Sequence, residues 1–181
     1  MRNSWALFVA GVSLACLCLV PIALAAAEGA AWVKVEPLAE GFIVQMPLLP
    51  ERTVKETSTF AGTVEDVSYR AKRGGETFMA TRVDLPGIAA FFMSDSSLLD
   101  SIRDSFLEKG NGTEKTYVDV KRDGYEGKKL DFTMHKDAAK EDARAEFFIV
   151  DGKMLSFTGI VPHGHSMADV DRFLASIDIE D

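Results

Sequence analysis

Two histidines near the C-terminus have the spacing that best suits metal chemistry. His163 and His165 flank a glycine and follow Pro162, so both imidazoles are expected in a turn. Neutral imidazole is a common ligand of zinc and other transition metals, and His135 or Asp169 could complete such a site. The same residues also suit a solvated loop between a strand and a helix. A metal-assisted enzyme using His163 and His165 is therefore the alternative hypothesis.

Hydroxyl and carboxylate side chains form no recognisable catalytic set. Ser156 and Ser166 are candidate nucleophiles, but the chain has no Gly-x-Ser-x-Gly motif to expose one at a tight turn. The pairs Glu65-Asp66 and Glu141-Asp142 could transfer protons, yet acidic residues at turns and strand starts ordinarily keep a surface hydrated. We therefore predict no catalytic residue and no cofactor.

Basic residues gather around one expected turn. Lys121, Arg122, Lys128 and Lys129 surround Tyr125, a combination that could hold an anionic group such as a phosphate. Charged side chains also keep sheet edges of separate molecules from pairing. Both interpretations of these residues stay open.

A short apolar segment lies where a polar loop would be expected. Residues 87–93 read Gly-Ile-Ala-Ala-Phe-Phe-Met between an expected strand and an expected helix. Loops are normally polar, so Ile88, Phe91, Phe92 and Met93 either pack as a buried cover or form an apolar contact surface. They are the predicted surface for a protein partner or a small apolar ligand.

The first 27 residues have the three parts of a secretory signal peptide. Arg2 is the only charged residue before Glu28, an apolar run follows over residues 5–24, and small residues dominate 23–27. The apolar run is nearly long enough to span a bilayer, so an uncleaved anchor is the alternative.

Cleavage is favoured over an anchor by Pro21 and by the alanine-rich end of the segment. We expect it after Ala25 or Ala27. The mature chain would then be one domain of residues 28–181, periplasmic or secreted and free of the membrane.

Charge and cysteine content exclude several classes of function. The 181-residue chain has 20 basic and 28 acidic residues; without residues 1–27 it has 19 and 28, a net charge of −9. That surplus of acid disfavours nucleic acids and anionic membranes as partners. Cys16 and Cys18 are the only cysteines. The mature chain therefore has no disulfide, zinc–thiolate site or cysteine nucleophile.

Alternating apolar residues and turn signals predict seven β-strands. They span residues 41–47, 64–71, 76–84, 116–122, 129–135, 145–150 and 153–161. Asp151-Gly152, between the last two, favours the positive φ angles of a type I′ turn, which matches the twist of paired strands. Gly74-Gly75 is a second turn signal. Such tight turns predict antiparallel pairing.

Two segments have apolar residues at helical spacing. The first lies between Asp95 and Lys109, with Ser94 or Asp95 as its cap, Gly110 after its last turn, and an apolar face of Leu98, Leu99, Ile102 and Phe106. The second begins at a capping box, Ser166 to Asp169, and its apolar face is Met167, Val170, Phe173, Leu174 and Ile177.

The order of these elements predicts an α+β fold, an antiparallel sheet of six or seven strands flanked by helices. Strands 76–84 and 145–161 carry apolar residues on both faces. Both faces of the sheet are therefore expected to be covered.

A series of short motifs runs through residues 36–179. They are Phe-x-Val-x-Met-Pro at 42–47, Asp-Leu-Pro at 84–86, Gly-Tyr-Glu-Gly-Lys-Lys at 124–129 and Phe-Leu-x-Ser-Ile at 173–177. Their order resembles small bacterial envelope proteins with the PsbP-like fold, an α/β/α sandwich. The resemblance implies an assembly or interaction module, as in photosystem and Ran-binding relatives, and transfers no catalytic residue. We therefore expect a non-catalytic binding or interaction module of the bacterial cell envelope.

Overall fold

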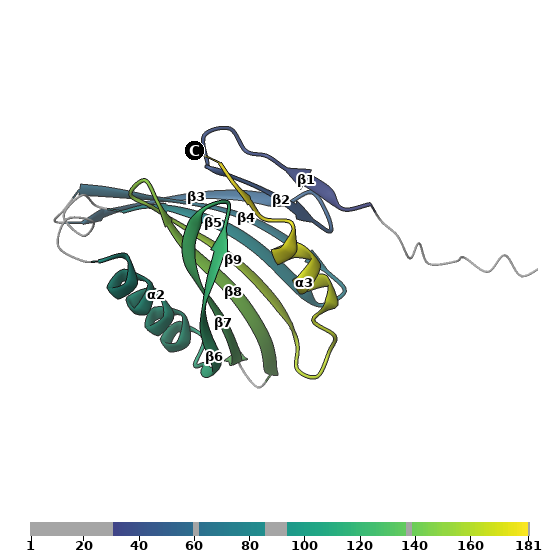
Figure 1. Ribbon diagram of the computed structural model, residues 1–181. Coiled ribbons are helices and arrows are strands. Elements are labelled where there is room, and N and C mark those ends of the chain that lie inside the picture. The colour runs from purple at the N-terminus through teal and green to yellow at the C-terminus, as the bar shows by residue number, and fades with distance from the viewer. Residues whose placement is uncertain (1–30, 60–61, 86–93, 137–138, 181) are drawn as a thin grey trace, which may run out of the picture.

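A twisted seven-stranded antiparallel sheet organises the protein (Figure 1). The computed structural model describes residues 31–59, 62–85, 94–136 and 139–180. In spatial order the strands are β3 (Glu51–Thr59), β4 (Gly62–Arg73), β5 (Glu76–Asp84), β9 (Lys153–Pro162), β8 (Ala139–Val150), β7 (Tyr125–Lys136) and β6 (Thr113–Arg122). All neighbours pair antiparallel. The predicted α+β class with a seven-stranded antiparallel sheet is confirmed.

Two-residue turns join three of the hairpins. The central residues have φ angles of +58° and +90° at Gly74-Gly75, +49° and +95° at Asp123-Gly124, and +48° and +75° at Asp151-Gly152. Positive φ at both positions is the type I′ conformation. The hairpin predicted at Asp151-Gly152 is confirmed, because Val150 pairs with Lys153 across the turn.

Strand β3 was not predicted from the sequence. Its residues are almost all polar, and its one large apolar side chain, Val54, is 40% exposed. The strand exists because its backbone pairs with β4 along its whole length, from Glu51 opposite Arg70 to Thr59 opposite Gly62. Backbone pairing of an edge strand needs no alternating apolar pattern.

The strand predicted at residues 41–47 lies outside the main sheet. It is β2 (Phe42–Met46), the centre of a second sheet with β1 (Val33–Val35) and β10 (Asp178–Ile179). Phe42, Val44 and Met46 alternate along this strand, share one face and are fully buried.

Helix α3 (Ala168–Ala175) lies with the small sheet on one face of the large sheet (Figure 1). Phe42 contacts Phe157 of β9 with ring centroids 5.3 Å apart, and Phe78 of β5 contacts Phe173 of α3 at 5.7 Å. The predicted capping box is wrong. Helix α3 begins at Ala168 without a side-chain cap, and the Ser166 hydroxyl accepts a hydrogen bond from the Ala168 amide just before the first turn.

Helix α2 (Asp95–Lys109) lies on the opposite face of the sheet, as Figure 1 shows. Ser94 is the N-cap, and its Oγ accepts a hydrogen bond from the Ser97 amide. Gly110 does not adopt the left-handed conformation that is common for a glycine after a helix; Asn111, with φ +43°, does. Gly110 is needed for space, because a Cβ there would lie 3.2 Å from the Phe106 carbonyl and 3.3 Å from Met134. Among the described residues no helix is both long and apolar enough to cross a membrane.

Candidate functional site

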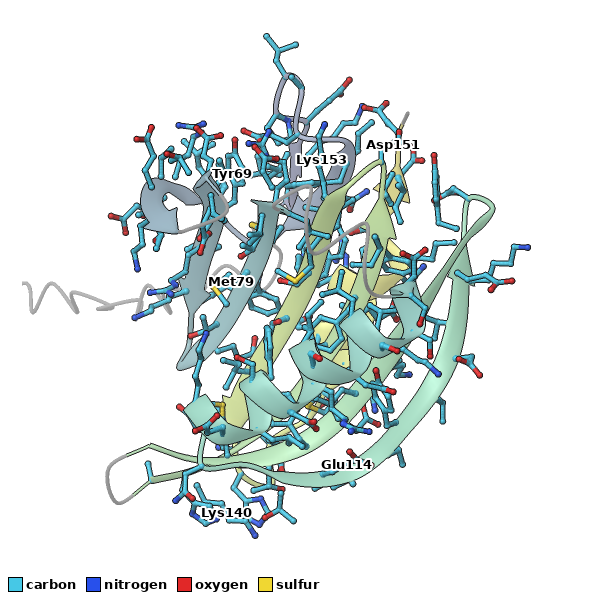
Figure 2. The ribbon with its side chains drawn as sticks, turned by 90° about the vertical axis from the view of Figure 1, so that its left-hand side faces the viewer. Tyr69, Met79, Glu114, Lys140, Asp151 and Lys153 are labelled. Carbon is cyan, nitrogen blue, oxygen red and sulfur yellow. The ribbon has the colours of Figure 1, made fainter. Side chains whose placement is uncertain are left out.

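In the part of the chain that the structure describes, helix α2 covers one half of its face of the sheet and no other element covers the rest. It packs on β7 and β8 through Leu99 and through Phe106, whose ring centroid lies 4.8 Å from that of Phe147. Figure 2 shows Met79 of β5 beside this helix, on strands that the helix does not cross. The predicted cover on both faces of strand 76–84 is therefore incomplete.

A cavity of about 540 Å³ lies between α2 and the uncovered strands; we call it the groove. That volume falls within the ~300–1,000 Å³ typical of small-molecule sites. Its apolar lining comes from Met79, Val83, Ile102, Phe106, Phe132, Met134, Met154 and Ile160. The rest of its lining is Lys55, Asp66, Ser68, Arg70, Thr81, Ser105, Lys109, Gly110, Ser156 and Thr158.

Strand periodicity explains why these side chains face the groove. On β9, Leu155 and Phe157 are buried in the core beneath α3, so the alternate residues Ser156 and Thr158 point to the α2 face. Pairing then aligns residues of three strands in cross-strand rows: Asp66–Val83–Met154, Ser68–Thr81–Ser156 and Arg70–Met79–Thr158. One row is thus composed of hydroxyls, and each row beside it has a charged residue on β4 and an apolar residue on β5.

Thr158 has an unusual hydroxyl for a buried residue. The residue is 2% exposed, and Oγ1 has no hydrogen-bond partner among the residues that the structure describes. Leaving such a group unpaired costs roughly 1–3 kcal/mol. Thr158 is among the residues that line the groove, although its Oγ1 is itself covered by protein atoms.

Arg70 differs from the other arginines in the described part of the chain. Six of these pair with carboxylates: Arg52, Arg73, Arg82, Arg103, Arg122 and Arg144. Arg172 lies over the Trp32 ring at 4.5 Å. The guanidinium of Arg70 instead contacts the Met79 sulfur at 3.6 Å and has no carboxylate or aromatic partner among the described residues.

The groove is positively charged within an acidic protein. Lys55, Arg70 and Lys109 line it together with one carboxylate, Asp66, whereas the whole chain has a net charge of −8. Asp66 accepts a hydrogen bond from Ser68 at 3.0 Å.

The two predicted histidines do not converge on a metal-binding cluster. His163 Nδ1 lies 2.9 Å from Asp142 Oδ2, and His165 is exposed. Another suggested ligand, Asp169, pairs with Arg73 at 2.5 Å. In the described ranges there is no group of three or more His, Cys, Asp or Glu side chains that could hold a metal ion.

Asp142 links the histidine turn to the sheet. Besides His163, it contacts Lys115 Nζ at 2.6 Å and accepts a hydrogen bond from the Gly164 amide at 3.2 Å. Burial raises the pKa of Asp142, but the hydrogen bonds from Lys115, Gly164 and His163 outweigh burial and hold that pKa well below its usual range. The ionised carboxylate of Asp142 therefore stabilises this turn.

The other predicted site residues have different outcomes in the structure. Ile88, Phe91, Phe92 and Met93 lie outside the described residues, so their role stays a prediction. In the basic cluster, Arg122 pairs with the buried Glu146 at 2.6 Å and Lys128 pairs with Asp119 at 2.5 Å. Two of its four cations are thus neutralised. The candidate nucleophile Ser156 lies in the groove, whose described lining contains no histidine.

Sequence reasoning missed the groove, although two signals for it were present. Ser156 and Thr158 interrupt a largely apolar strand, and Thr81 is a buried hydroxyl residue that follows three apolar residues in β5. Hydroxyls at positions where a sheet is buried indicate either polar partners or a polar cavity.

Comparison with known proteins identifies the fold. No family model and no curated protein sequence matches this chain. Among solved structures, cyanobacterial PsbP (CyanoP) from Synechocystis sp. PCC 6803 is similar, with a TM-score of 0.59 and 11% identity over 83% of this chain and 93% of that chain. The fold is therefore PsbP-like, as the motif order predicted.

Two further structures are similar to a lesser degree. LpqN, involved in cell envelope biogenesis of Mycobacterium tuberculosis, has a TM-score of 0.48 and 8% identity over 83% of this chain and 91% of its own. PA94 from Pseudomonas aeruginosa, a protein of unknown function, has a TM-score of 0.39 and 12% identity over 77% and 86%. At such identities, similarity describes the fold and transfers no function.

Proposed function

We propose that this protein is an exported, non-catalytic binding module whose groove holds a small molecule with an apolar body. The observation that carries this proposal is the half-covered sheet: α2 packs on β7 and β8 and leaves an apolar cavity of about 540 Å³ over β4, β5 and β9. Protein interiors are close-packed, and voids larger than a water molecule are few. A cavity of this size, lined by side chains of five strands and a helix, is suited to a ligand.

The composition of the groove favours apolar ligands of variable shape. Three of its lining residues, Met79, Met134 and Met154, are methionines. Their unbranched, polarisable side chains adapt to irregular surfaces better than branched ones do. Each Å² of apolar surface that a ligand removes from water contributes about 25 cal/mol.

The lining also supports a binding role over a catalytic one. Its titratable groups, within the described residues, are two lysines, one arginine and one aspartate. General-base activation of a hydroxyl needs a base within hydrogen-bond reach, usually an imidazole. Asp66 is the one carboxylate in this lining. It accepts a hydrogen bond from the hydroxyl of Ser68, two residues away on β4. The rival hypothesis of a metal-assisted enzyme gains no ligand cluster from the described residues.

Export is part of the proposal and rests on residues 1–27. Their charged start, apolar run and small-residue end are typical of a cleaved signal peptide. N-terminal sequencing of the protein from an envelope fraction should start at Ala26 or Glu28. Protein that retains Met1 in that fraction would contradict cleavage and favour the uncleaved anchor.

Binding can be tested with a neutral fluorescent probe, N-phenyl-1-naphthylamine, whose emission increases in apolar sites. We expect saturable binding to the wild-type protein. Ser105 of α2 lines the groove, so Ser105→Trp should fill it and abolish binding. Ser96 is exposed and lies nine residues earlier, about half a turn away around the helix axis. Ser96→Trp is therefore the matched control and should bind like the wild type.

Thermal unfolding of both variants should show that they fold. Saturable binding lost only in Ser105→Trp supports the groove as the site. Absence of binding to the wild type, or equal binding by Ser105→Trp, would contradict the proposed function.

A further inference from the structure

We infer that the ligand of the groove is an amphiphile with an anionic headgroup, held in one half of the groove by Arg70 and Lys109. This inference rests on the proposed function and specifies the class of ligand. The inference concerns the charge of the ligand's headgroup, whereas the proposed function concerns only the ligand's apolar body.

The register of the sheet places the two cations in the same half of the groove. Arg70 belongs to the row Arg70–Met79–Thr158, which continues to Ala145 and then Leu130 of β7. Lys109 ends α2 next to Gly110, whose carbonyl accepts a hydrogen bond from His135, further along β7. Arg70 and Lys109 therefore both lie in the half of the groove away from Asp66, and the level of Lys109 is about 17 Å further along the strand direction than the Arg70 row.

The other half of the groove is closer to electrical neutrality. There Asp66 of β4 pairs directly with Lys55 of β3, so the two opposite charges are cross-strand neighbours. Four residues separate Asp66 from Arg70 on β4, a distance of about 13 Å along a strand. The unbalanced positive charge of the groove thus lies in the half that contains Arg70 and Lys109.

Arg70 has the chemistry of an anion-binding residue that lacks its anion. In the described part of the chain it is the arginine with neither carboxylate nor aromatic partner, although the protein carries a surplus of acid. A guanidinium can donate two parallel hydrogen bonds to a carboxylate or a phosphate. The Met79 sulfur, which the guanidinium contacts at 3.6 Å, belongs to the apolar lining of the groove.

Polarity along the Arg70 row matches an amphiphile. Arg70 is exposed, Met79 is half-buried and Thr158 is buried. A headgroup at Arg70 would stay in contact with water while the apolar chain follows the methionines into the groove. Thr158 lies at the inner end of this row, where its Oγ1 is covered by protein atoms and has no hydrogen-bond partner among the described residues.

The inference can be tested by displacement of the neutral probe with four compounds that share one C12 chain. Dodecanoate and dodecyl phosphate are anionic, dodecanol is neutral and dodecylamine is cationic. Each is used below its micellar concentration at pH 7. We expect both anions to bind about tenfold or more tightly than dodecanol, the gain from hydrogen bonds to a charged group. The ratio between the two anions distinguishes a carboxylate from a phosphate headgroup.

Arg70→Gln and Lys109→Gln should each weaken dodecanoate binding about tenfold and leave dodecanol binding unchanged. Lys140→Gln is the control for overall charge. Lys140 is exposed on β8, does not line the groove and has no carboxylate partner in the described ranges (Figure 2). It should bind all four compounds like the wild type.

The possible failures are distinguishable. If the probe binds but dodecanoate and dodecanol compete equally, or if Lys140→Gln loses as much dodecanoate affinity as Arg70→Gln, the anionic headgroup is wrong and the proposed function stands. If the probe does not bind the wild type, the proposed function is contradicted, and the inference that rests on it is overturned as well.

Discussion

Glu40 and Arg82 form a buried ion pair that ties the small sheet to the large one, with Glu40 Oε2 3.2 Å from a terminal nitrogen of Arg82. Glu40 is 5% exposed and lies in the loop between β1 and β2; Arg82 is 9% exposed and lies on β5. Tyr69 donates a hydrogen bond to the other oxygen of Glu40 at 3.3 Å. Arg82 also pairs with Glu65 and, at 3.2 Å, with Asp84.

Removing Arg82 should be costly because the buried Glu40 would keep only the exposed Arg52, 3.4 Å away, as a cationic partner. Arg82→Met is expected to lower the free energy of unfolding by about 3–5 kcal/mol. Lys72 is exposed on the neighbouring strand, so Lys72→Met should change stability by about 0.5 kcal/mol at most. Urea unfolding measures both. In the double variant with Glu40→Gln, the cost should be less than the sum of the single costs. Additive costs would show that the two residues are not coupled.

The lowered pKa of Asp142 predicts how stability depends on pH. Its folded pKa lies below the value of about 3.9 in an unfolded chain, so the ionised carboxylate stabilises the fold fully above about pH 4. That contribution is lost as pH falls from about 4 through the folded pKa. Asp131, whose pKa is lowered by Arg144 against the effect of burial, adds to the same trend.

Asp142→Asn should therefore lower stability at pH 7 and flatten the loss of stability below pH 4. Urea unfolding at a series of pH values measures this dependence. Asp119 is exposed and pairs only at the surface with Lys128, so Asp119→Asn should keep the wild-type pH profile. An Asp142→Asn profile parallel to that of the wild type would contradict the assigned role.

Gly159 allows helix α3 to pack closely on β9. A Cβ at this position would collide with the Val170 side chain, which is fully buried. Gly159→Ala is expected to destabilise the protein by about 1–3 kcal/mol, the usual cost of overpacking. Adding Val170→Ala should recover part of that loss, because it removes the atoms in conflict. A double variant less stable than the sum of its single changes would argue against this contact.

The histidine pair can be tested directly. Since His163 is hydrogen-bonded to Asp142, we expect elemental analysis of the purified protein to show no stoichiometric transition metal. His163→Ala should instead weaken stability through loss of this hydrogen bond, by about 1 kcal/mol. A stoichiometric metal that disappears in His163→Ala would restore the hypothesis of a metal-assisted enzyme.

Local features of this protein were predictable from local sequence. The Asp151-Gly152 dipeptide predicts its hairpin because few other residues adopt positive φ at both positions of a turn. The apolar faces of α2 and α3 follow from a 3.6-residue period, and that of β2 follows from alternation. In each case the information lies within a dozen consecutive residues.

Only the tertiary structure determined how these elements pack together and where they form the groove. Alternation in Phe42–Met46 predicts a buried face but not the sheet to which β2 belongs. Strand β3 consists of polar residues and forms because its backbone pairs with that of β4. The groove depends on the register of three strands and on the half of the sheet that α2 covers. Arg70, Lys109 and Thr158 come together there from distant parts of the chain. Contacts of that kind arise from packing between elements, which periodicity within one element does not encode.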